Sequence, residues 1–325
     1  MFNFLPPELI RMIIFVALLI GLVFLNALVM VYLERKIAGH IQRRLGPMEV
    51  GPHGIFQTLI DGIKLIGKQL IIPRDVNRPL FRLAPLLAFT PVVLPFVVIP
   101  FSQKIQARDL NLGLVFIIAM SAINVLAIFV AGWSSNNKYS LFGAMRSVAQ
   151  NIAFEIPILL SVLSVVLMTN TFSMQGIVTA QSNIWFIIVQ PVAFLIYFIA
   201  CIAETNRAPF DLPEAESELT AGFHTEYSGM GFGLFFLGEY GNMFVVCSIA
   251  TVLFLGGWHG FTLPFNDYGA IIWFMFKVYF LLFLMIQIRW TYPRVRFDQL
   301  MNLAWKYLIP ISLVNVLITA VIVKL

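Results

Sequence analysis

Residues 204–218, Glu-Thr-Asn-Arg-Ala-Pro-Phe-Asp-Leu-Pro-Glu-Ala-Glu-Ser-Glu, form an acidic stretch between two apolar segments that are each long enough to cross a membrane. Six of the chain's 16 acidic residues lie between Glu204 and Glu226. Carboxylates beside the hydrocarbon core of a bilayer are costly, so such residues usually have a function. The stretch therefore predicts a helical membrane protein in which protons or a polar ligand meet the membrane at this loop.

The composition of the whole chain also indicates a membrane protein. Hydrophobic residues make up 60% of the 325 residues and charged residues 11%, and the mean hydropathy is +0.89. A soluble domain is about one quarter charged. We expect a single membrane domain over residues 1–325. Its basic residues lie in loops between apolar runs, so the net charge of +5 does not indicate nucleic acid binding.

Eight apolar runs are long enough to cross about 30 Å of hydrocarbon as helices. The expected spans are 9–33, 80–101, 111–133, 147–168, 184–204, 234–257, 269–289 and 305–323. The first run is too long for the hydrophobic region of a signal peptide and lacks a small-residue cleavage site. The sequence thus predicts an all-α, polytopic fold with eight transmembrane helices.

The distribution of Lys and Arg predicts the orientation of these spans. The loops after the odd-numbered spans, with the adjoining helix ends, hold sixteen of these residues, and the opposite side holds four. Basic residues are enriched on the cytoplasmic side of membrane proteins. The acidic loop, residues 205–233, is therefore expected to be cytoplasmic, and both termini are expected on the outer side.

The first cytoplasmic loop, residues 34–79, contains an amphipathic helix at 52–70. Polar residues recur at helical spacing along one face, and apolar residues form the other. The polar face consists of Gln57, Asp61, Lys64 and Lys68. A helix of this length and pattern lies in the membrane interface rather than crossing the membrane. It serves either as a surface anchor or as the wall of a ligand site.

Four ionisable residues lie within or at the edge of the apolar runs: Glu155, Glu204, Glu239 and Lys277. One interpretation is a static ion pair between Lys277 and either Glu155 or Glu239. However, carboxylates outnumber cations here, and carboxylates that share a desolvated site repel one another and can exchange protons near neutral pH. Because no ionisable side chain beyond Lys277 continues toward the outer side, we expect the proton path to leave sideways, into another subunit, or along water.

The chain shows no pattern for a redox cofactor or a metal. The four histidines lie in or beside loops at no ligand-like spacing, and the two cysteines, Cys201 and Cys247, lie in separate apolar runs. Neither haem nor an iron–sulfur cluster can be bound by such a set. If the protein takes part in electron transfer, the electrons are expected to arrive from a partner.

Several motifs resemble those of a known family. They are residues 204–218, Glu34-Arg-Lys, Gln42-Arg-Arg-Leu-Gly-Pro47, Gly132-Trp-Ser-Ser-Asn-Asn-Lys-Tyr-Ser140 and Tyr292-Pro-Arg-Val-Arg-Phe-Asp-Gln-Leu-Met301. Together they resemble the H-subunit family of proton-pumping NADH:quinone oxidoreductase, respiratory complex I. The resemblance covers essentially the whole chain. Met48 and Phe297 stand where this family usually has Asn and Tyr.

The resemblance implies a subunit at the joint between the peripheral and membrane arms of an enzyme in the bacterial inner membrane. It implies no cofactor in this chain, quinone as substrate, and flavin and iron–sulfur clusters in partner subunits. The expected partners are the peripheral-arm quinone-site subunits, the small membrane-arm subunits and membrane lipid, with the helix at 52–70 framing the quinone entrance. By motif position, the quinone chamber is lined by Glu34, Arg35, Arg44, Asp61 and Arg207. The proton-linked path consists of Glu155, Glu204, Asp211, Glu214, Glu216, Glu218, Glu226 and Glu239.

Three other functions compete with this interpretation. The first is the corresponding subunit of a membrane-bound hydrogenase or a formate-oxidising complex, although the full-length acidic loop and the Arg-rich first loop favour a quinone enzyme. The second is a stand-alone proton or cation transporter, but the chain shows no inverted repeat. The third is a structural scaffold, which the cost of burying Glu155 and Glu239 argues against.

Overall fold

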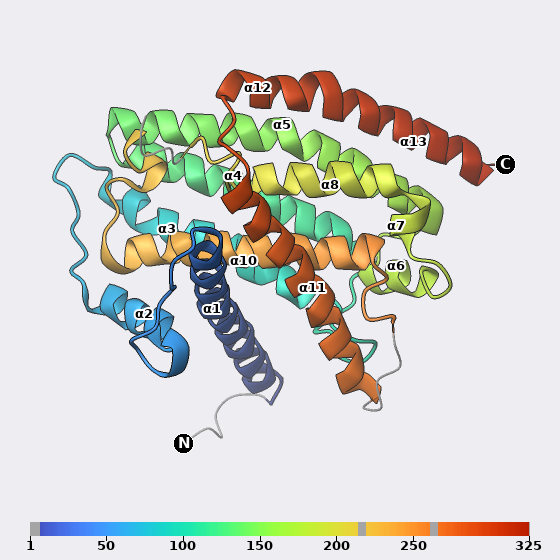
Figure 1. The fold of residues 1–325 in the computed structure, drawn as a ribbon, viewed down its shortest axis with the longest axis horizontal. Helices are drawn as coiled ribbons and strands as arrows, with labels where there is room; N and C mark the ends of the chain where they lie inside the picture. The colour runs from blue at the N-terminus through green and yellow to red at the C-terminus, as the bar shows by residue number, and fades with distance from the viewer. Residues whose placement is uncertain (1–6, 214–218, 261–265, 325) are drawn as a thin grey trace.

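The computed structural model describes residues 7–213, 219–260 and 266–324, without the side chains of 7–14 and 266–268. Within these ranges the fold is all-helical and contains no strand (Figure 1). The elements are α1 (Pro7–Ile41), η1 (Pro52–Gly54), α2 (Gln57–Gly67), α3 (Arg78–Val93), η2 (Leu94–Val97), α4 (Gly113–Ser134), α5 (Lys138–Thr169), α6 (Met174–Ala180), α7 (Phe186–Val189), α8 (Pro191–Glu204), η3 (Gly222–His224), α10 (Gly229–Phe254), α11 (Asn266–Thr291), α12 (Phe297–Asn302), η4 (Leu303–Leu308) and α13 (Ile309–Lys324).

The helices form a bundle around α10. Figure 1 shows α3, α4, α5, α8 and α10 running along one direction, with α1 and α11 crossing one face at a tilt and α12–α13 lying along α5. The most apolar window of α10 is 78% buried, whereas that of the C-terminal helices is 17% buried. We call the end of the bundle that carries α2 the α2 end, and the end that carries α6 and α7 the α6 end. Because α10 runs through the core from one end to the other, it can connect groups at both.

Seven described helices are long and apolar enough to cross a membrane, and an eighth segment is shorter. The expected span 184–204 is divided into α7 and α8 at Gln190, whose backbone is not helical (φ −127°, ψ 55°). Proline removes an amide donor and disfavours helical geometry in the residue before it, so Pro191 accounts for the division. The unbroken part, α8, has 14 residues, or about 21 Å of helix at 1.5 Å per residue.

Helix boundaries differ from those expected, chiefly at the α2 end. Helix α5 begins at Lys138 rather than at 147, because the side chain of Asn137 caps it by accepting a 2.9 Å hydrogen bond from the amide of Tyr139. Helix α10 begins at Gly229, five residues before the expected start of that span. The acidic loop is therefore shorter than residues 205–233.

The helix expected at 52–70 is formed over a shorter range, Gln57–Gly67. The short turn η1 precedes α2 and is itself irregular, since His53 within it has φ 55°. Helix α2 packs beside α1 and the start of α10. A Cβ on Gly229, which has φ 53°, would lie 3.0 Å from the carbonyl oxygen of Lys68, so glycine is needed for this close approach. The apolar side chains of Leu59, Ile63 and Ile66 on α2 are exposed.

Candidate functional site

A series of polar contacts joins α1, α11 and α10 near the α2 end. The side chain of Glu34 on α1 is buried and forms an ion pair with Arg289 of α11. The hydroxyl of Tyr240 on α10 donates a 2.5 Å hydrogen bond to the other carboxylate oxygen of Glu34. A buried carboxylate is tolerated only with such partners. These contacts fix Glu34 between three helices.

Arg207, in the loop after α8, extends this series to Glu239. Its guanidinium carbon lies 4.3 Å from the centroid of the Tyr240 ring, and its Nη2 lies 3.3 Å from Oε2 of Glu239. The cation is stabilised by the aromatic face as well as by the carboxylate. We call the four residues Glu34, Tyr240, Arg207 and Glu239 the charge relay. They connect the α2 end of α1 to the interior of α10.

Asp211 is held at the edge of the charge relay. Its carboxylate lies 3.1 Å from Nη2 of Arg294, and the carbonyl of Pro209 accepts a 3.0 Å hydrogen bond from the amide of Val295. Burial raises the pKa of Asp211, although the neighbouring Arg294 opposes this by favouring the charged form. The part of the acidic loop near Asp211 is thus docked on the segment that follows α11.

Glu204, the last residue of α8, lies between two small cavities. A cavity of about 50 Å³ is lined by Glu204 and Glu155, and one of about 30 Å³ by Glu204 and Glu239. Ser121 of α4 donates a 2.5 Å hydrogen bond to Glu204. The structure thereby brings together three carboxylates that were expected to share a path, from α5, α8 and α10.

An apolar groove lies between α1, α2 and α10. Its volume is about 530 Å³, and Arg35 and Asp61, whose side chains are 2.6 Å apart, stand at its polar edge. A second cavity of about 220 Å³ adjoins it, since both are lined by Val31, Arg35 and Phe236. This second cavity is also lined by Glu34, Arg44 and Tyr240. Four of the five residues expected around a quinone thus line these two spaces, and Arg207 lies against Tyr240 instead.

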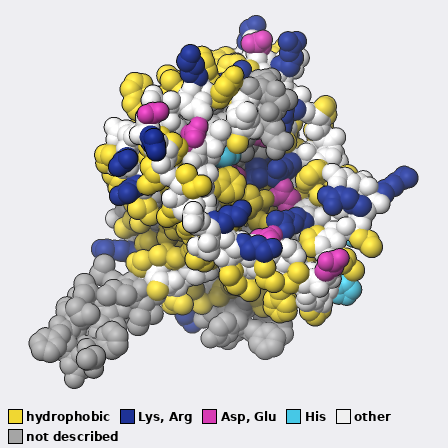
Figure 2. Space-filling model, turned by 90° about the vertical axis from the view of Figure 1, so that its left-hand side faces the viewer, with side chains coloured by type: hydrophobic (Ala, Val, Ile, Leu, Met, Phe, Trp, Pro, Cys, Tyr) yellow, Lys and Arg dark blue, Asp and Glu magenta, His cyan; other side chains and the backbone are white. Residues whose placement is uncertain are grey.

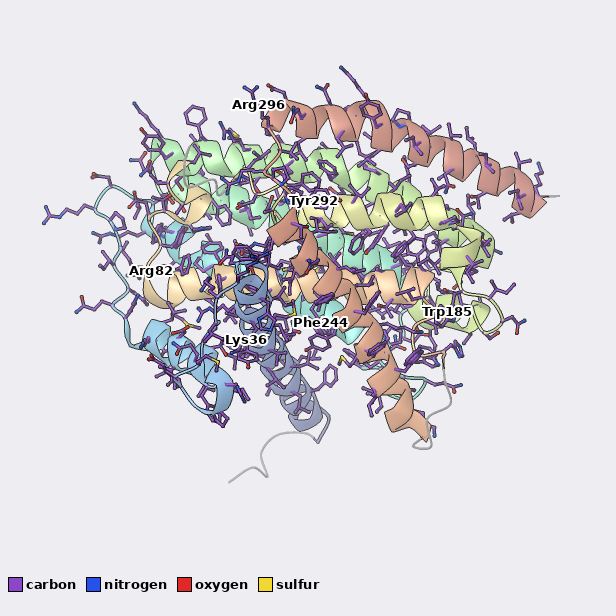
Figure 3. The ribbon with its side chains drawn as sticks, in the orientation of Figure 1. Lys36, Arg82, Trp185, Phe244, Tyr292 and Arg296 are labelled. Atoms are coloured by element: carbon purple, nitrogen blue, oxygen red, sulfur yellow. The ribbon has the colours of Figure 1, made fainter. Side chains whose placement is uncertain are left out.

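Lys277 does not form the ion pair with Glu155 or Glu239 that was one interpretation of the sequence. In the described chain its ammonium donates hydrogen bonds to the carbonyls of Leu255 (2.6 Å), Gly257 (2.9 Å) and His259 (2.6 Å), just beyond the end of α10. It also lies 4.4 Å from the ring centroid of Trp185, which Figure 3 places at the α6 end, away from Lys36 and Arg82. Its charge is satisfied by the carbonyls at a helix C-terminus.

Glu226 lies apart from the membrane-embedded carboxylates. Its Oε1 accepts a 2.6 Å hydrogen bond from Asn137, and it lines neither cavity beside Glu204. The next residue, Tyr227, stacks on Phe81 with ring centroids 4.1 Å apart, and burial raises its pKa to about 12. This segment is thus packed against α3 and against the turn between α4 and α5. The expected site residues Glu214, Glu216 and Glu218 lie outside the described residues.

The sequence reasoning missed Tyr240, Arg289, Ser121, Asn124 and Asn242. The two asparagines line both cavities beside Glu204. A signal for them was present, because Asn124 follows Ser121, and Asn242 follows Glu239, by one helical turn within apolar runs. Arg289 is one of the sixteen basic residues used above to predict the orientation, and only the tertiary structure reveals its contact with Glu34.

The described residues contain no group of three or more His, Cys, Asp or Glu side chains that could hold a metal ion. Both Cys201 and Cys247 are free and buried.

Comparison with known proteins gives consistent matches over nearly the whole chain. The sequence model of the NADH dehydrogenase family matches residues 13–320. The H subunit of NADH-quinone oxidoreductase from Desulfotalea psychrophila is 51% identical over 95% of this chain and 96% of the relative. The proteins of the same name from Carboxydothermus hydrogenoformans (98% of this chain, 91% of the relative) and Geobacillus thermodenitrificans (90% and 88%) are each 48% identical.

Proposed function

Since this chain belongs to the NADH dehydrogenase family, we propose that it is the membrane subunit of a proton-pumping NADH:quinone oxidoreductase that forms the quinone chamber entrance and begins the proton path. The observation that carries the proposal is the charge relay. It runs from the cavity lined by Glu34 and Tyr240 to Glu239, which lines a cavity beside Glu204. Quinone chemistry at one end can therefore change the charge at the other.

The protein is a multi-pass membrane protein by the length and composition of its helices. We place it in the bacterial inner membrane with the α2 end in the cytoplasm and both termini outside. Figure 2 shows the α2 end, where Lys and Arg side chains gather with acidic side chains among them. This distribution follows the positive-inside tendency. A charged cytoplasmic face also suits docking of the peripheral subunits that would carry flavin and iron–sulfur clusters.

The groove between α1, α2 and α10 is where a quinone tail would enter from lipid. Its apolar walls and its volume of about 530 Å³ fit an isoprenoid chain, while the adjoining cavity offers polar groups for the quinone head. In this proposal the amphipathic helix α2 lies in the membrane interface, with Ile63 and Ile66 toward lipid. Arg35, Arg44, Asp61 and Glu34 surround the head, and Arg207 acts through Tyr240.

Quinone reduction adds negative charge and takes up protons, so it alters the electrostatic field at Glu34 and along the charge relay. The protonation of Glu239, Glu204 and Glu155 then changes together, because neighbouring carboxylates titrate as a set. Asp211, Glu226, Glu214, Glu216 and Glu218 of the acidic loop supply protons from the cytoplasmic side. The resulting charge change biases the position of the loop and adjoining helices. Onward transfer requires neighbouring small membrane subunits or water.

The proposal is tested with Glu155→Gln and Glu239→Gln in the assembled enzyme. Both variants are expected to lose proton pumping by about ten-fold or more, since each removes a proton-binding group from the path. Asp109→Asn is the matched control, because Asp109 bonds to Ser173 at the N-terminus of α6, far from the charge relay. Normal pumping with normal quinone turnover in both Glu variants would refute the carboxylate path.

The quinone site needs a separate measurement. A quinone analogue with a photoreactive tail, bound to the intact complex, is expected to label residues of α1, α2 or α10 around the groove. Excess unmodified quinone should abolish this labelling. Labelling confined to helices remote from the groove, such as α13, would refute this entrance.

A further inference from the structure

Two asparagine side chains lie within the apolar helices beside Glu204. Asn124 is on α4 and Asn242 on α10, and both line the cavity shared with Glu155 as well as the cavity shared with Glu239. Both side chains are half-buried, and across residues 7–213, 219–260 and 266–324 neither amide has a protein hydrogen-bond partner. An amide left without a partner inside a membrane costs several kcal/mol by general transfer measurements. Something other than the described protein groups must therefore satisfy them.

Water fits these cavities in size and in chemistry. A cavity of roughly 10 to 15 Å³ holds one water molecule, which needs two to four polar partners. The two cavities measure about 50 and 30 Å³. The larger one offers the amides together with Glu155, Glu204 and Ser121, and the smaller one offers them with Glu204 and Glu239. Each cavity thus has room and partners for at least one ordered water.

Among the described residues of α4 and α10, the two amides are the only polar side chains that line both cavities. An asparagine both donates and accepts hydrogen bonds but does not ionise in the physiological range. It can therefore orient a water molecule without binding the proton itself. A carboxylic acid in the same place would hold the proton and add a further charge.

We propose that Asn124 and Asn242 are positioning residues that hold the water molecules through which protons pass between Glu239, Glu204 and Glu155. This inference rests on the proton path of the proposed function. In each step a carboxyl group releases a proton to a bridging water, and that water releases another proton to the next carboxylate. No group is oxidised or reduced, and the only net movement is one proton.

The test uses Asn124→Leu and Asn242→Leu, singly and together, in the assembled complex. Leucine has the same branching and the same number of side-chain heavy atoms as asparagine but cannot form a hydrogen bond with water. The double Leu variant is expected to lower both quinone-dependent NADH oxidation and proton pumping by about ten-fold or more, with the KM for quinone unchanged within about two-fold. The double Ser variant keeps a hydroxyl at each position and is expected to retain at least about half of the rate.

Asn26→Leu is the matched control, because Asn26 is a buried asparagine on α1 that accepts a 3.2 Å hydrogen bond from Tyr279 and lines neither cavity. It should keep both the rate and the pumping ratio. A structure of the assembled wild-type complex in which ordered waters are visible provides a second measurement that does not depend on a variant. It is expected to show waters bonded to both amides.

Three results would overturn the inference. They are near-normal pumping in the double Leu variant, equally slow Ser and Leu variants in fully assembled complex, or cavities without water in the second measurement. If the Leu variants fail to assemble, the water structure decides. Failure of the proposed function is distinguishable, because in that case Glu155→Gln and Glu239→Gln also pump normally. If those two variants lose pumping while the Leu variants do not, only the role of the amides is refuted.

Discussion

Tyr240 of α10 donates its hydroxyl hydrogen to Glu34 of α1 over 2.5 Å, although the two residues are 206 positions apart in the sequence. Glu34 also pairs with Arg289, so its carboxylate has two partners from two different helices. The ring of Tyr240 carries Arg207 on its face. Tyr240 therefore joins the cavity at Glu34 to the ion pair of Arg207 with Glu239.

We expect Tyr240→Phe to uncouple these two parts of the charge relay. The aromatic face for Arg207 remains, but Glu34 loses one hydrogen bond of the kind worth about 1.5 kcal/mol or more to a charged group. Quinone-dependent NADH oxidation should fall about ten-fold. The control is Tyr292→Phe, because Tyr292 is 64% exposed. Equal rates in both variants would contradict a role for the Tyr240 hydroxyl.

Asp61→Asn should change quinone binding more than stability. The ion pair of Asp61 with Arg35 is partly exposed, with side-chain exposures of 32% and 43%, and such pairs contribute at most about 1 kcal/mol. The melting temperature of the complex should therefore change little. Loss of the partner that orients Arg35 at the groove should raise the KM for quinone about five-fold. Asp75→Asn, in an exposed loop, is the control, and a large fall in melting temperature with unchanged KM would reverse the assignment.

His224→Asn should reduce the loss of stability at acid pH. Burial lowers the pKa of His224 below 6.5, although Glu239 opposes this, so the folded protein favours the neutral ring. The stabilisation from a lowered histidine pKa is present above the unfolded pKa of 6.5 and is lost as the pH falls through the folded pKa. Melting temperatures at pH 7.5 and 5.5 should therefore differ less in His224→Asn than in the wild type. The exposed His40 provides the control variant His40→Asn, and an equal acid sensitivity in the wild type and His224→Asn would exclude this contribution.

Gly143→Ala should loosen the contact between α5 and the turn that precedes Glu226. A Cβ at this position would lie 2.8 Å from the Cα of Gly222, and backbone cannot move aside as a flexible side chain can. Overpacking of this kind costs about 1–3 kcal/mol, and the melting temperature should fall. Gly21→Ala in α1 is the control because no atom lies within 4 Å of its added methyl group. A melting temperature in Gly143→Ala equal to that of Gly21→Ala would show that the turn can shift freely.

The sequence was sufficient to predict most helices, because apolar runs of membrane length have few other interpretations. It also placed Glu155, Glu204 and Glu239 in adjoining spans, where the structure brings them to neighbouring cavities. The family resemblance was confirmed by the match over residues 13–320. The dipeptide Gln190-Pro191 indicates that the fifth segment is divided there. Hydropathy alone, however, predicts one continuous span over α7 and α8.

Contacts between distant helices could not be predicted from the sequence. Arg289 and Glu34 are 255 positions apart, and loop lengths do not determine which faces of two spans meet. Lys277 illustrates the same limit, since the sequence left open only a static pair with Glu155 or Glu239, and the structure provides backbone carbonyls. Backbone carbonyl groups are free at the end of every helix, whatever its sequence. No local sequence pattern therefore predicts that they bind a lysine.

The attachment of Lys277 to Leu255, Gly257 and His259 gives α10 one fixed end. Its other end is Gly229, and Glu239 and Asn242 lie near the middle of the helix. A rigid helix that is held at one end moves mainly at its other end. A shift of the acidic loop would thus swing α10 about a pivot near Lys277, with the widest excursion at Gly229 and a smaller displacement of Glu239 and Asn242.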